Sequence, residues 1–335
     1  MSGETLVSVS GLTVHFPVRG SRETVKAVDG VDFTVAAGAT FGVIGESGSG
    51  KSTLGRTLVC LQHPTAGRIM HAGRDPFSLP GAALRRHRRG YQIIFQDPGA
   101  ALSPRMTILD SVREPLDIAR AGSARERTQQ AREMLGRVGI GSTMHDRFPH
   151  ELSGGQKQRV NIARALTLRP RLIVCDEVVA ALDVSIQADI LNLFAELQQD
   201  FGLTYVFITH DLAVVTHISD MIAVMYLGRF VEIGPAEAIH ANPTHPYTTA
   251  LLSAEPEPLP RAMQSDRRIV LRGEIPSPIS PPSGCRFRTR CPYAESICAA
   301  VEPPWRETTP GRFAACHFAT SDTRATLPEP EILAS

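Results

Sequence analysis

Apolar and polar residues alternate in two stretches near the start of the chain, residues 6–16 and 28–35. This period of two predicts a pair of antiparallel strands. Three later stretches are largely apolar without alternation: TFGVIG at 40–45, RLIVCDE at 171–177 and LTYVFITH at 203–210. Apolar runs of this length are typical of strands that are buried on both faces of a sheet.

Segments whose apolar residues have the spacing of a helix lie between these apolar runs. KSTLGRTLVCL at 51–61 follows the first of them, and residues 123–138 are polar with an apolar stripe, as in an exposed amphipathic helix. Another helix is expected from near Ser153 to a point before Pro170, because proline disfavours the helical conformation in the residue before it. Residues 185–199 place apolar side chains at helical spacing: Ile186, Ile190, Leu193, Phe194 and Leu197. The alternation predicts an α/β fold with a mostly parallel sheet and helices on both faces.

The amino-acid composition changes near Ala254. EPEPLP at 255–260 and EIPSPISPPSG at 274–284 are rich in proline and have no periodicity. We therefore expect two units, residues 1–253 and a loop-rich module at 254–335. A chain of 335 residues with 42% apolar content is long enough for two such units.

Charge and hydropathy exclude several classes of function. The 35 Lys and Arg nearly balance the 34 Asp and Glu, so we expect no nucleic-acid partner. The basic run at residues 85–89 is better explained as a solvated face or a docking contact. The start of the chain has no signal-peptide pattern, and no run approaches the roughly 18 apolar residues of a spanning helix. The protein is therefore expected inside the cell, with at most a peripheral membrane role.

GESGSGKS at residues 45–52 fits the phosphate-binding loop pattern in full and lies between a predicted strand and a predicted helix. Glycines let backbone N–H groups surround phosphate oxygens, and the helix N-terminus adds a positive dipole. Lys51 is expected to reach the β and γ phosphates of a nucleotide, and Ser52 to bind Mg²⁺. The predicted nucleotide contacts of the loop are Gly45, Ser47, Gly48, Gly50, Lys51, Ser52 and Thr53.

LSGGQ at residues 152–156, just before LIVCDE at 172–177, resembles the ATP-binding cassette family when it follows such a loop. The resemblance covers about the first 250 residues. It implies an ATPase with a RecA-like core, an antiparallel β subdomain and a helical subdomain. In this family the signature of one subunit completes the ATP site of another, so Ser153, Gly154, Gly155 and Gln156 are expected to act on a partner's nucleotide. With one cassette, the chain is expected to dimerise with itself or with a relative.

The resemblance also implies roles for residues that follow the buried strands. Asp176 would hold Mg²⁺, and Glu177 would be the general base for the attacking water. His210 would contact the γ phosphate, while Gln96 would bind Mg²⁺ and link the phosphate to a transmembrane partner. Asp183 would face the opposing subunit. The chain departs from the family's usual Asp-Glu-Pro and Ser-Ala-Leu-Asp at two positions, Val178 and Ala180.

Phe16 resembles the aromatic residue that stacks on adenine in this family. An aromatic ring is a suitable platform for a base. A residue of an alternating strand could equally be buried in the small sheet, and the sequence leaves both interpretations open.

The region after the cassette resembles the C-terminal region of ATPases from bacterial oligopeptide and dipeptide importers. The matching stretches are HPYTTALLSAEPEPLP at 245–260, LRGEIPSP at 271–278, PPSGC at 281–285 and RCPYAESIC at 290–298. CDEVVAALDVSIQ at 175–187 is more similar to the F-type member. The resemblance implies a D-type ATPase partner, two permease subunits and an extracytoplasmic substrate-binding protein, with this chain at the cytoplasmic face of the inner membrane. Nickel and glutathione are alternative cargoes.

Four cysteines lie in this region. The intervals between Cys285, Cys291, Cys298 and Cys316 are five, six and seventeen residues. They match neither a zinc ribbon nor a ferredoxin. The importer resemblance implies a 4Fe-4S cluster, with Zn²⁺ as the alternative, and a soluble ATPase regulated by a redox metal centre is a further hypothesis. Cys60 and Cys175 have apolar neighbours in the sequence and are expected in the core.

Overall fold

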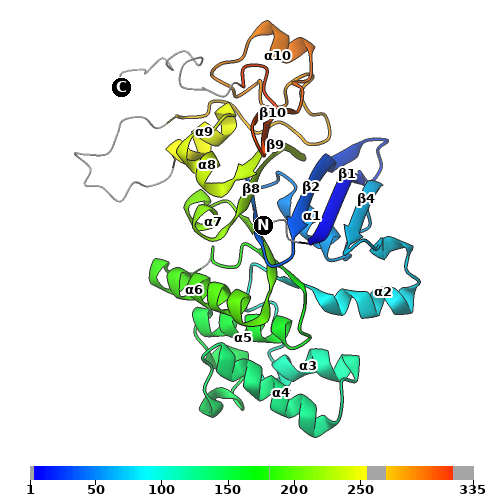
Figure 1. Ribbon diagram of the computed structural model, residues 1–335, viewed down its shortest axis with the longest axis vertical. Coiled ribbons are helices and arrows are strands. Elements are labelled where there is room, and N and C mark those ends of the chain that lie inside the picture. Colours follow the sequence, from blue (N-terminus) through cyan, green and yellow to red (C-terminus); the bar gives the residue numbers. More distant parts are fainter. Residues whose placement is uncertain (1–3, 181, 255–268, 320–335) are drawn as a thin grey trace, which may run out of the picture.

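The computed structural model describes residues 4–180, 182–254 and 269–319 (Figure 1). The proline-rich EPEPLP stretch and Ala181 lie outside these residues. Two sheets organise the described chain, one of three strands and one of eight. No helix among the described residues is long and apolar enough to cross a membrane.

The small sheet confirms the antiparallel pair that the alternating pattern predicted. Its strand order is β2-β1-β4, and Val14 of β1 lies opposite Val28 of β2. Its strands are β1 (Thr5–Pro17), β2 (Thr24–Ala36) and β4 (Ala66–His71). β4 was not predicted from the sequence, because only Ile69 and His71 of this strand are buried and the alternation is too short to detect.

The large sheet has the order β10-β11-β9-β8-β3-β7-β6-β5. Its strands are β3 (Thr40–Ile44), β5 (Tyr91–Ile94), β6 (Leu172–Asp176), β7 (Thr204–Thr209), β8 (Met221–Tyr226), β9 (Arg229–Pro235), β10 (Arg306–Thr309) and β11 (Arg312–Ala314). The expected parallel pairing is confirmed from β8 through β3, β7 and β6 to β5. The other edge, β9 to β10, pairs antiparallel, so the sheet is mixed.

Alternate residues of the buried strands pack into two different cores. In β6, Leu172 and Val174 pack with α1 and the small sheet, whereas Ile173 and Cys175 pack with α5 and α6. Both faces of the strand are therefore dry, which explains why its sequence has no polar alternation.

Two helix starts agree with the sequence. Ser123 and Ser153 cap α4 and α5 through capping boxes with Glu126 and Gln156, and α5 ends at Leu166, before Pro170. The helices α3, α4 and α5 pack together at one end of the molecule (Figure 1). The helices are α1 (Lys51–Leu58), α2 (Gly81–His87), α3 (Ile108–Ala119), α4 (Ala124–Arg137), α5 (Gly154–Leu166), α6 (Val184–Phe201), α7 (Leu212–Ile218), α8 (Ala236–Ala241), α9 (Pro246–Ser253) and α10 (Ser296–Ala300). Short 3-10 turns occur at Pro76–Ser78, Arg88–Gly90, Ser142–Met144 and Pro149–Glu151.

The described part of the C-terminal region, residues 269–319, is called the cysteine module below. It lies at the end of the molecule opposite α4 and contributes α10, β10 and β11 (Figure 1). Phe313 of β11 pairs with Ile233 of β9, so this module extends the main sheet. The sequence predicted loops here because strands of three and four residues carry too little periodicity to be recognised.

Candidate active site

The phosphate-binding loop connects β3 to α1, as the sequence predicted, and two of its glycines are sterically required. A Cβ atom on Gly45 would lie 2.1 Å from the carbonyl oxygen of Met225, and one on Gly50 would lie 1.9 Å from that of Ala27. Both residues also have positive φ, 155° and 108°. The loop therefore passes so close to the backbones of β8 and β2 that only glycine fits at these positions.

Lys51 extends into the curve of the loop. Its Nζ donates hydrogen bonds to the carbonyl oxygens of Gly45 at 2.6 Å and Glu46 at 2.8 Å. Burial lowers the pKa of the Lys51 ammonium from its usual value, while the carboxylates of Glu177 and Asp176 act in the opposite direction. A cation is thus held among backbone groups, an arrangement suited to binding phosphate oxygens.

Ser52 and Asp176 meet at the end of β6. The Ser52 hydroxyl donates to Oδ1 of Asp176 at 2.9 Å, although 124 positions separate them in the sequence. Burial raises the pKa of the Asp176 carboxyl and so does the charge of Glu177, whereas the Ser52 hydrogen bond lowers it. Hydroxyl and carboxylate oxygens are ligands that Mg²⁺ prefers, so this pair fits the predicted metal site.

Glu177 lies between Gln96 and His210. Gln96 Nε2 donates to Glu177 Oε2 at 2.7 Å, and His210 Nδ1 lies 3.6 Å from Glu177 Oε1. The three residues follow β5, β6 and β7, whose carboxyl ends meet at one edge of the sheet. Glu177 has a φ of 52°, which is uncommon for a residue with a side chain and typical of functional sites. The carboxylate is held in place and could accept a proton from water.

The signature residues are separate from this chain's own loop. Ser153 and Gly154 are exposed at the start of α5, and within the described residues the side-chain hydrogen bonds of Ser153 and Gln156 are made with each other, not with residues 45–52. Gly155 is buried, and a Cβ atom there would lie 2.8 Å from Cγ2 of Ile186. Asp183 is exposed at the start of α6. Their contact with a second subunit stays a prediction.

The remaining sequence hypotheses concern Phe16 and the two departures from the family pattern. Phe16 is partly buried against the small-sheet core, opposite Val25, so neither of its two interpretations is settled. Val178 is only 4% exposed and packs in the main core, where an apolar side chain is well accommodated. Ala180 is exposed.

Three residues of the loop's surroundings were missed by the sequence analysis. Both oxygens of the Glu46 carboxylate accept hydrogen bonds from the guanidinium of Arg290, at 2.6 and 3.0 Å. The backbone N–H of Glu46 donates to the hydroxyl of Tyr247 at 2.8 Å. Glu46 and Tyr247 stand in motifs that were recognised, but no local pattern could pair them across 201 residues.

The four cysteines of the module are close neighbours. The pKa of Cys291 is raised to about 12 and that of Cys316 to about 11, chiefly by burial, and the charges of the other thiols act in the same direction. Backbone N–H groups of Tyr293 and Phe318 hydrogen-bond these two sulfurs and partly offset the increase. Sulfurs that accept backbone hydrogen bonds fit a thiolate metal site. Among the described residues, however, no three His, Cys, Asp or Glu side chains are arranged to hold a metal ion.

The other two cysteines agree with the sequence analysis. Cys60 and Cys175 are fully buried, as expected for core residues. Burial raises the pKa of Cys60 to about 12 and that of Cys175 well above its usual value, so both thiols stay protonated and unreactive at neutral pH.

Two family models match the chain. One is described as "ABC transporter" and matches residues 28–180; the other is described as "Oligopeptide/dipeptide transporter, C-terminal region" and matches residues 231–298. The oligopeptide transport ATP-binding protein AppF of Bacillus subtilis is 49% identical over 321 residues, which are 94% of this chain and 98% of AppF. A putative peptide import ATP-binding protein of Brucella ovis is 52% identical over 316 residues, with the same two coverages.

Solved structures agree with these matches. The dimeric, post-hydrolysis structure of the ATP-binding cassette MJ0796, bound to ADP and Pi, superposes with a TM-score of 0.62 at 30% identity. The matched region covers 69% of this chain and 98% of the MJ0796 chain. Clostridium perfringens cbiO1, part of an ABC transporter complex, gives a TM-score of 0.64 at 27% identity and covers 71% of this chain and 92% of its own.

Proposed function

Because the chain belongs to the ATP-binding cassette transporter family, we propose that it acts as one of two ATPase subunits bound to a membrane permease. It hydrolyses ATP and thereby energises peptide import, as the relatives that match nearly its whole length indicate. The observation that carries the mechanism is the convergence of Lys51, Asp176 and Glu177 at one edge of the main sheet.

Each residue of the site has a proposed role. Lys51 and the N–H groups of the loop bind the ATP phosphates, and Phe16 stacks on the adenine. Ser52, Asp176 and Gln96 would hold Mg²⁺, which would neutralise phosphate charge. Glu177 accepts the proton of the attacking water and is oriented by the hydrogen bond from Gln96, while His210, beside the same carboxylate, contacts the γ phosphate.

The exposure of the signature supports an ATP site shared between two subunits. Ser153 and Gly154 face solvent in a single chain, and the related cassette MJ0796 is described as dimeric with ADP and Pi bound. We propose a D-type paralogue as the second subunit, with the signature of each chain completing the nucleotide site of the other.

Ser153→Arg is expected to leave ATP binding to this chain's own loop unchanged and to lower hydrolysis in the assembled dimer by at least about tenfold. Ser123→Arg is the matched control, since Ser123 caps α4 through an equivalent capping box away from the site. Both variants lose a helix cap, but only the first should lose ATPase activity. If the purified single chain forms no dimer and still hydrolyses ATP at a rate per chain that is independent of its concentration, the shared site is contradicted.

Two permease subunits and an extracytoplasmic substrate-binding protein complete the proposed importer, with this chain at the cytoplasmic face of the inner membrane. Uptake of a labelled tripeptide into cells with and without the gene tests the proposal. Loss of uptake, restored by the wild-type gene but not by a Glu177→Gln copy, supports peptide import driven by this ATPase. Unchanged peptide uptake together with loss of nickel or glutathione uptake would assign a different cargo.

We further propose that Cys285, Cys291, Cys298 and Cys316 hold a 4Fe-4S cluster. The support is their mutual proximity and the backbone N–H groups that hydrogen-bond three of the sulfurs, those of Cys285, Cys291 and Cys316. Bound metal would also order a proline-rich module with few large apolar residues, as structural metals do in small domains. Zn²⁺ is the alternative metal for the same four thiolates.

Cys291→Ser is expected to remove the brown colour of anaerobically purified protein and to expose the module to proteases. Wild-type protein should contain about four irons per chain. Cys60→Ala is the control and should keep the colour, because Cys60 lies in the core outside the module. Colourless wild-type protein with stoichiometric zinc would decide for Zn²⁺, and metal-free protein whose module resists proteases would contradict both.

A further inference from the structure

Glu46 places a carboxylate inside the phosphate-binding loop. It is the second residue of GESGSGKS, and its charge is close enough to Lys51 to raise the pKa of that ammonium. A free carboxylate at this point would repel the phosphates of a nucleotide. The loop therefore needs a cation that pairs with Glu46.

The cysteine module supplies that cation. Arg290 is the residue before Cys291, and its guanidinium binds both oxygens of Glu46 in a fork. The Arg290 side chain is 8% exposed and that of Glu46 is 24% exposed, so water screens the pair only in part. Paired bonds between arginine and a carboxylate are directional and stronger than a single contact between neutral groups.

A second contact fixes the backbone of the same residue. The Tyr247 hydroxyl accepts the N–H of Glu46, and Tyr247 follows His245 and Pro246 at the start of α9. Burial lowers the pKa of His245 to about 3, so its ring stays neutral and Nδ1 accepts the N–H of Tyr247 at 3.1 Å. Glu232 stabilises the segment before α9. Its carboxylate accepts hydrogen bonds from the backbone N–H groups of Thr244 and His245 and forms an ion pair with Arg312 of β11.

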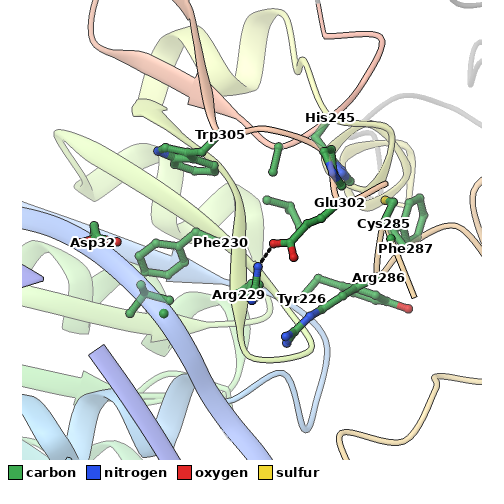
Figure 2. A pocket seen from close by; sticks show the side chains of 16 residues that line it. Asp32, Tyr226, Arg229, Phe230, His245, Cys285, Arg286, Phe287, Glu302 and Trp305 are labelled. Carbon is green, nitrogen blue, oxygen red and sulfur yellow. Dashed lines mark ion pairs between the residues drawn. The ribbon is translucent and has the colours of Figure 1, made fainter. Parts of the chain in front are cut away.

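The module itself is fastened to the cassette around a cavity of about 190 Å³ (Figure 2). Arg286 pairs with Asp29 of β2, and Arg229 of β9 pairs with Glu302 of the module. Phe287 packs edge-on against Tyr226, with ring centroids 5.3 Å apart. Arg290 is thus held by a packed module and is not a free surface side chain.

We propose that Arg290 is a positioning residue of the nucleotide site, through which the cysteine module neutralises Glu46 and sets the affinity of the phosphate-binding loop for ATP. Arg290 bonds Glu46 and does not need to touch the reacting atoms. It therefore acts on ATP binding and not on the chemical step. The inference rests on the nucleotide site proposed above.

The test is a titration of the purified full-length chain with Mg²⁺ and a fluorescent ATP analogue. Arg290→Gln leaves Glu46 unpaired and is expected to weaken binding about tenfold. Adding Glu46→Gln to Arg290→Gln removes the unpaired charge and should restore binding to within about threefold of wild type. Arg288→Gln is the matched control, expected to change binding by less than about twofold, because its guanidinium bonds Ser283 within the module.

Steady-state hydrolysis gives a second readout. Arg290→Gln should raise KM for ATP and leave kcat nearly unchanged, since the interaction is made with the bound ground state and the transition state alike. Recovery in the double variant separates this electrostatic role from general loosening of the module, which a second substitution would not repair.

The proposal is overturned if Arg290→Gln binds ATP like wild type, or if the double variant binds no better than Arg290→Gln alone. In both cases wild-type binding of ATP would leave the proposed function intact. Failure of the wild-type chain to bind ATP would instead refute the nucleotide site itself.

Discussion

Glu177→Gln is expected to lower ATP turnover by about a hundredfold to ten-thousandfold while ATP binding changes by less than about threefold. The amide keeps the size and shape of the carboxylate, so the loop, Ser52 and Asp176 stay in place. It cannot accept the proton of the attacking water. In the wild-type protein the carboxylate lies between Gln96 Nε2 and His210 Nδ1. The substituted amide would occupy the same place but could not act as a base.

The measurements are phosphate release by the assembled dimer and binding of a fluorescent ATP analogue. Glu196→Gln is the control, because Glu196 is an exposed residue of α6. It loses the same charge and should hydrolyse ATP at the wild-type rate. Turnover by Glu177→Gln close to that rate would remove Glu177 from the role of base.

Gly50→Ala is expected to weaken ATP binding by more than about a hundredfold. The new Cβ would lie 1.9 Å from the carbonyl oxygen of Ala27 and 2.9 Å from Cε of Met225. Methionine can move, but the backbone of β2 is fixed by its pairing with β1. The loop would have to leave its place beside β2, and Lys51, the next residue, would move with it.

Gly73→Ala is the control that distinguishes the steric clash at Gly50 from the backbone strain that a positive φ alone causes in an alanine. Gly73 has a φ of 75°, and a Cβ atom there would meet nothing within 4 Å. The control should lose some thermal stability yet bind ATP normally. The same titration with the fluorescent analogue, together with thermal melting, distinguishes the two variants. Normal ATP binding by Gly50→Ala would mean that the loop tolerates a side chain against β2 and that the described packing does not govern the site.

The sequence by itself was sufficient for features that depend on neighbouring residues. Burial on both faces of a strand removes polar residues from it, so β3, β6 and β7 could be recognised as continuous apolar runs. The phosphate-binding loop could be located because its glycines, Lys51 and Ser52 are consecutive and lie between a strand and a helix. A helix start near Ser153 was also expected, and the structure shows why it lies there: Ser153 and Gln156 form a capping box within four consecutive residues.

Strand order brought other predicted residues together. Gln96, Glu177 and His210 were each singled out by the resemblance to the cassette family, yet their contact depends on β5, β6 and β7 being adjacent in the sheet. Parallel strands end at the same edge, which is why residues 81 positions apart can share a hydrogen bond.

Only the tertiary structure decided what surrounds the loop. β10 and β11 are too short for a periodic signal; β11 pairs with β9, a strand about 80 residues earlier, and β10 pairs with β11. Arg290 lies 244 positions from Glu46, in a proline-rich segment whose local sequence predicts no partner. Local sequence patterns reflect the burial of each residue and its contacts with residues nearby in the sequence. A charge pair between distant segments depends on the tertiary fold, and it leaves no periodicity or spacing in the sequence.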